Sequence, residues 1–62
     1  MPDYSEWEQE VIEIVADDQG IAYSDASGIV ERQNFFLQQA WGMAMDAAQT
    51  AEKISEESSS AP

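Results

Sequence analysis

The sequence predicts a small all-α protein, with a bundle of three helices as the preferred architecture. Apolar side chains recur at three- and four-residue intervals along most of the chain, which is the spacing of one helical face. A length of 62 residues allows one domain, and without Cys no disulfide can support it. We expect a single helical domain over residues 1–57 and a disordered, Ser-rich tail over residues 58–62.

Residues 4–19 have the clearest helical pattern in the chain. Their apolar stripe consists of Tyr4, Trp7, Val11, Ile14 and Val15. Acidic residues follow the same spacing on the opposite face, and these are Glu6, Glu10, Glu13 and Asp17. The pattern predicts an amphipathic helix with one buried and one strongly negative side.

Both ends of this first helix carry capping signals. Ser5 and Glu8 have the spacing of a capping box, and Asp3 with Glu6 offers the same pair two residues earlier. Gly20 follows the last periodic residue, where a glycine commonly adopts the left-handed conformation that ends a helix.

A second helix is predicted over residues 24–41, with Ser24 as its N-cap. Its apolar face contains Ala26, Val30, Gln33, Leu37, Ala40 and Trp41. Gln33 is polar at the centre of that face and needs a partner or water. Phe35 points almost directly away from the face.

Gly42 leaves two architectures open. In the preferred one the second helix ends there and a third covers residues 46–56, because Asp46 and Gln49 have the spacing of a capping box. The alternative is a helical hairpin with one long second helix from Ser24 to about Glu56, since apolar residues continue in steps of four and three. That seam is mostly Ala and would bury little area, which favours three helices.

The charge balance restricts the partners. Thirteen acidic and two basic residues give a net charge of −11, so we expect no direct binding to nucleic acid or to an anionic membrane surface. A partner selected by charge would be a basic protein, although the acidity could instead serve only solubility. The acidic N-terminal residues do not resemble a secretory signal and no apolar run could span a membrane, so we expect a soluble, cytoplasmic protein.

The acidic row of the first helix is a candidate binding surface. Glu6, Glu10, Glu13 and Asp17 extend over about 16 Å of helix and could imitate a row of phosphates. The alternative interpretation is the solvated side of an ordinary amphipathic helix.

Enzymatic activity, a metal site and a cofactor are not expected. The chain has no His and no Cys, and so small a bundle should have no room for a pocket of a few hundred cubic ångströms. Asp17, Asp18 and Asp25 surround one turn, but their spacing fits no calcium loop.

The middle of the chain predicts an interface. Phe35, Trp41, Met43 and Met45 could form a patch that a small monomer cannot cover, and aromatic and Met residues are enriched at interface cores. We therefore expect a non-enzymatic interaction module, self-associating as a homodimer or another homo-oligomer, that presents an acidic surface to a basic protein. Inhibitor, antitoxin-like and nucleic-acid-mimic roles belong to this class. The alternative is a purely structural homo-oligomer whose acidity serves solubility.

Overall fold

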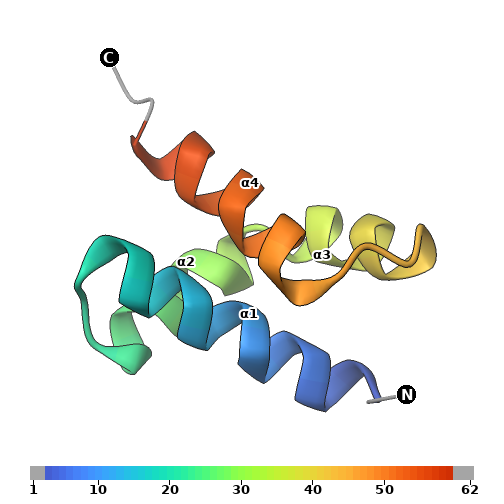
Figure 1. The fold of residues 1–62 in the computed structure, drawn as a ribbon, viewed down its shortest axis with the longest axis horizontal. Coiled ribbons are helices and arrows are strands. Elements are labelled where there is room, and N and C mark those ends of the chain that lie inside the picture. Colours follow the sequence, from blue (N-terminus) through green and yellow to red (C-terminus); the bar gives the residue numbers. More distant parts are fainter. Residues whose placement is uncertain (1–2, 60–62) are drawn as a thin grey trace.

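The computed structural model describes residues 3–59, and every regular element in this range is a helix (Figure 1). The helices are α1 Tyr4–Gln19, α2 Tyr23–Arg32, α3 Asn34–Gly42 and α4 Ala47–Ser59. The all-α bundle predicted from the sequence is confirmed. Of the expected tail, Ser58 and Ser59 belong to α4, and residues 60–62 lie outside the described residues.

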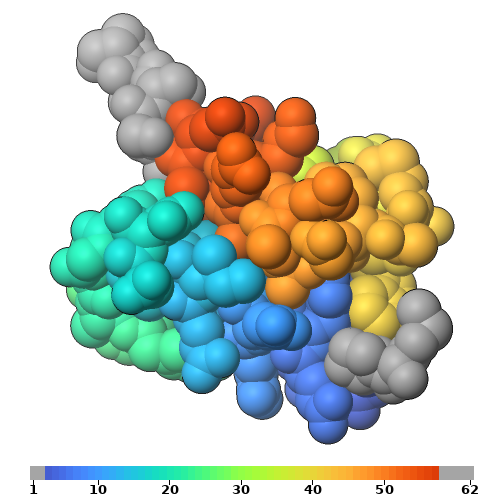
Figure 2. Space-filling model, in the orientation of Figure 1, coloured from blue at the N-terminus to red at the C-terminus, as the bar shows by residue number. Residues whose placement is uncertain are grey.

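The helix α1 is the centre of the bundle, because α2 and α4 both pack against it (Figure 1). In the space-filling view the orange and red atoms of α4 lie directly against the blue atoms of α1 (Figure 2). The buried apolar residues come from all four helices: Trp7, Val11, Ile12, Val15, Ala26, Val30, Leu37, Ala40, Ala47, Ala51 and Ile54. The small residues Ala47 and Ala51 allow α4 to approach α1 closely.

The predicted second helix is divided into α2 and α3 at Gln33, where the backbone leaves the helical conformation with φ −101° and ψ 27°. The alternative of one long helix from Ser24 to about Glu56 is therefore wrong. The core continues across the division. Val30 lies before the bend and Leu37 after it, and both are completely buried.

The caps of the first helix follow the predicted signals. Asp3 is the N-cap, and its Oδ1 accepts a hydrogen bond from the backbone N–H of Glu6 at 2.9 Å, so the earlier of the two possible registers is used. Gly20 has φ 64°, and the N–H of Ile21 donates to the carbonyl of Ala16 at 3.0 Å. This is the expected left-handed C-terminus. The predicted N-cap Ser24 is wrong, because α2 begins at Tyr23 without a side-chain cap.

The connection from α3 to α4 repeats the same motif with an alanine in place of the glycine. The N–H of Ala44 donates to the carbonyl of Trp41 at 3.1 Å, and the N–H of Met45 donates to that of Ala40 at 3.0 Å. Ala44 has φ 59°, whereas Gly42 is an ordinary residue at the end of α3. Asp46 directly precedes α4 and caps it as predicted, because its Oδ1 accepts a hydrogen bond from the backbone N–H of Gln49 at 2.8 Å.

Replacing Ala44 with Gly should raise the free energy of unfolding by about 1 kcal/mol, because only glycine adopts the left-handed conformation without steric cost. Gly42→Ala should also stabilise, by up to about 1 kcal/mol, since the position is helical and a Cβ there meets open space. Urea unfolding of both variants tests the assignment. Destabilisation by Gly42→Ala would mean that Gly42 is the left-handed residue.

Candidate interaction surfaces

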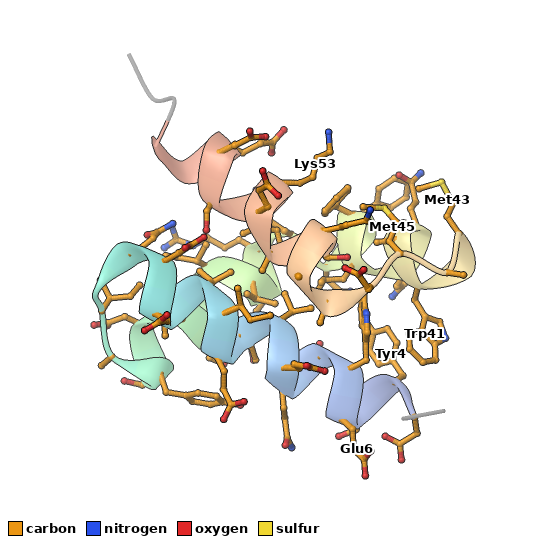
Figure 3. The ribbon with its side chains drawn as sticks, in the orientation of Figure 1. Tyr4, Glu6, Trp41, Met43, Met45 and Lys53 are labelled. Carbon is orange, nitrogen blue, oxygen red and sulfur yellow. The ribbon has the colours of Figure 1, made fainter. Side chains whose placement is uncertain are left out.

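The predicted acidic row lies on the solvent-exposed side of α1. Its four members are exposed, namely Glu6, Glu10, Glu13 and Asp17. In Figure 3, Glu6 points away from the bundle, and Lys53 lies on α4 at the opposite side of the molecule. Arg32, the other basic residue, is exposed at the end of α2. Neither cation therefore belongs to α1, and the row forms a negative surface without an interspersed positive residue.

Three aromatic rings meet at the N-terminal end of α1. The ring centroids are 5.6 Å apart for Tyr4 and Trp7, 5.4 Å for Tyr4 and Trp41, and 5.2 Å for Trp7 and Trp41. At these contact distances the rings pack on one another, and no ligand fits between them. Trp7 is 4% exposed, and its indole N–H donates to the carbonyl of Met45 at 3.1 Å. The cluster thus joins α1 to the α3–α4 connection.

A groove of about 580 Å³ opens beside this cluster. Its apolar lining comes from α1, α3, α4 and the connection before α4: Trp7, Trp41, Ala44, Met45, Ala47 and Ala48. Two carboxylates complete the lining, Glu10 on α1 and the cap residue Asp46. The expectation that so small a bundle has no room for such a pocket is wrong. Three alanine side chains leave space beside two large indole rings. The sequence alone does not show that these two rings lie side by side.

Two of the four predicted interface residues line the groove, and two do not. Phe35 is 77% exposed and Met43 is 65% exposed, and neither lines the groove. Trp41 is 38% exposed and Met45 is half-buried against the core, and both line the groove. Figure 3 shows Trp41, Met43 and Met45 at the same end of the molecule. Of these four, Phe35 and Met43 are therefore the exposed residues outside the groove, and Trp41 and Met45 are those that line it.

The outer face of α3 carries no formal charge. Phe35, Gln38, Gln39 and Gly42 are all exposed along it, and every residue from Gln33 to Met45 is uncharged. In a chain with a net charge of −11, a negatively charged molecule that contacts this face meets no carboxylate on α3 itself.

The hydroxyl of Tyr4 is buried and has no hydrogen-bond partner among the described residues. Burial raises the pKa of this hydroxyl above its ordinary value of 10.0, and the negative charge of Glu8 raises the pKa further. The folded state therefore holds the phenolic proton more tightly than the unfolded chain does. This contribution to stability is fully present below the unfolded pKa and is lost as the pH rises through the folded pKa.

Tyr4→Phe should be neutral or stabilising by up to about 1 kcal/mol near pH 7, because it removes a buried hydroxyl that lacks a partner. Above the ordinary tyrosine pKa of 10.0, wild type should lose stability relative to the variant. Urea unfolding of both proteins at neutral and strongly alkaline pH measures the difference. A destabilised variant at neutral pH would show that the hydroxyl has a stabilising partner.

Within residues 3–59, no group of three or more Asp and Glu side chains is placed to hold a metal ion. None of the described helices combines the length and apolar character needed to cross a membrane. No protein-family model, curated protein or solved structure matches the chain. Its surfaces are therefore the basis on which a function can be assigned.

Proposed function

We propose that the protein is a non-enzymatic interaction module that presents the acidic row of α1 to a basic protein and associates with a second copy of itself through Phe35. The observation that carries this proposal is the separation of charge on the surface. Four exposed carboxylates line α1, whereas α3 has an exposed Phe and no formal charge. One side suits a cationic partner and the other suits an apolar contact.

The acidic row supports a partner whose surface is rich in Lys and Arg. A surface of one charge sign attracts an oppositely charged protein and raises the rate of encounter. The row extends over about 16 Å, from a rise of 1.5 Å per residue, which is long enough to engage several cationic side chains in sequence. A protein face that otherwise holds nucleic acid has this character, so inhibitor, antitoxin-like and nucleic-acid-mimic roles all fit.

The exposed Phe35 supports self-association. Contact between the acidic faces of two copies would bring like charges together, whereas contact through α3 would not. Covering an aromatic side chain that is 77% exposed would also remove from water the most exposed of the large apolar groups. The alternative is a purely structural homo-oligomer, in which Phe35 has this role and the acidity serves solubility alone.

Binding of a fluorescent lysine-rich peptide tests the acidic surface. Glu6→Gln, Glu13→Gln and Asp17→Asn together should weaken binding by about tenfold, since each exposed ion pair contributes a fraction of a kcal/mol. The matched control removes three exposed carboxylates elsewhere, by Asp25→Asn, Glu31→Gln and Glu52→Gln. Equal losses in the two triple variants would show that α1 is not a preferred surface.

The dependence on salt distinguishes binding of the basic peptide from self-association. Added salt should weaken peptide binding, because it screens attraction between opposite charges, and should strengthen self-association, because it screens repulsion between the two copies. If peptide binding is measurable and salt-independent, the charge-based interaction is wrong.

A further inference from the structure

We propose that the groove receives an arginine side chain of the basic protein partner. This inference rests on the proposed function, and it names the place at which one residue of that partner is bound. The guanidinium would pair with the carboxylates of Glu10 and Asp46, and the aliphatic stem would lie against Trp41. The volume of about 580 Å³ is within the range of sites for small organic groups, so it has room for one long side chain.

The groove is continuous with the acidic row of α1 through Glu10. This residue belongs to the row and also lines the groove. It follows Trp7 by three residues, and side chains at this spacing are neighbours on the surface of a helix. A basic segment that follows the row would therefore bring one of its side chains to the groove.

The lining combines apolar surface with charge of a single sign. Its two charged residues, Glu10 and Asp46, are both acidic and both exposed, and two indoles, three alanines and Met45 make up the rest. An anionic group would be repelled there, and a neutral apolar group would displace water from the carboxylates without replacing its hydrogen bonds. A cation on an apolar stem suits both parts of the lining, and Arg and Lys side chains have this form.

Trp41 favours arginine over lysine. Its side chain is 38% exposed and lines the groove, and its ring packs on Tyr4 and Trp7 at centroid distances of 5.4 and 5.2 Å. A planar guanidinium stacks on an aromatic face and donates to a carboxylate in a fixed fork, whereas an ammonium is a strongly hydrated point charge. Because neighbouring rings already position Trp41, binding would cost little ordering of this side chain.

Two fluorescent peptides of equal length and charge, one rich in arginine and one rich in lysine, test this preference. Wild type should bind the arginine peptide about threefold more tightly, the effect of one exposed cation–π contact. Ala48→Leu places a larger side chain at an exposed position in the groove, so it should weaken the arginine peptide by about fivefold and remove the preference. Ala22→Leu, the same change at an exposed alanine outside the groove, should leave both affinities unchanged.

A second pair of variants tests the carboxylate of the groove. Glu10→Gln should weaken binding of the arginine peptide by about fivefold, whereas Glu13→Gln should weaken it by about twofold. Both residues are exposed on α1 and both changes remove one negative charge, but only Glu10 lines the groove. Fluorescence anisotropy measures the dissociation constants. Equal losses would show that Glu10 acts only as a member of the row and would overturn the pairing.

The outcomes separate this inference from the proposed function. If the two peptides bind equally well and Ala48→Leu has no effect, the groove does not receive arginine, while weaker binding in the triple variant of Glu6, Glu13 and Asp17 still supports a basic partner. If neither peptide binds, the basic partner of the proposed function fails as well. If Ala48→Leu weakens self-association in sedimentation equilibrium and leaves peptide binding unchanged, a second copy occupies the groove and the inference is wrong.

Discussion

Replacing Trp7 with Ala is expected to remove much or all of the stability of the protein. Trp7 is 4% exposed, contacts the rings of Tyr4 and Trp41, and anchors Met45 through its indole N–H. Truncating a buried Trp to Ala typically costs about 3 to 5 kcal/mol. A chain of 62 residues has a total stability of only about 3 to 9 kcal/mol, so the loss removes much or all of it. Far-UV circular dichroism combined with urea unfolding measures the effect.

Phe substitutions separate the hydrogen bond from the packing. Trp7→Phe keeps an aromatic ring but removes the donor to the Met45 carbonyl, and should cost about 1 to 3 kcal/mol. The matched control is Trp41→Phe in the same cluster, where the side chain is 38% exposed, and this change should cost less than about 1 kcal/mol. Equal costs for the two variants would contradict the role of the Trp7 hydrogen bond.

Phe35→Glu should abolish self-association without loss of the fold. The side chain is 77% exposed in the single copy, so the substitution removes no core contact. It places a carboxylate where a second copy would be met, and that second copy also carries a net charge of −11. Sedimentation equilibrium should therefore give a single-copy mass of 6.9 kDa for the variant.

The control for this variant is Gln9→Glu, which adds the same charge at an exposed position on α1. It should change self-association only slightly, through the small increase in overall repulsion. Circular dichroism should show unchanged helix content in both variants. If Gln9→Glu dissociates the protein as completely as Phe35→Glu, the effect is one of total charge rather than of Phe35.

Residue spacing in the sequence predicted the features of the fold that depend on residues close together in the chain. The stripe in residues 4–19, the cap at Asp3, the left-handed Gly20 and the cap at Asp46 all depend on neighbours within five residues. The division at Gln33 could not be predicted in this way, because the apolar residues on its two sides, Val30 and Leu37, keep the spacing of one continuous helical face. Similarly, the sequence has a Gly at position 42, whereas the residue with the left-handed conformation is Ala44.

The candidate sites show the same distinction. Helical periodicity alone predicted an acidic row on α1 and a Phe35 that points away from the apolar face. The structure shows that the residues of the row and Phe35 are all exposed. The groove joins α1, the end of α3 and the start of α4, so its existence depends on how the chain turns at Ala44. Neither the meeting of Trp7 with Trp41 nor the inclusion of Glu10 in the lining follows from spacing.

The mass of the unmodified protein in solution is the most direct test of the central claim, that a second copy covers Phe35. Sedimentation equilibrium over a concentration series should show the average mass rising from 6.9 kDa toward at least twice that value, with the rise beginning at lower concentration when salt is added. A mass of 6.9 kDa at every concentration and salt level would contradict it.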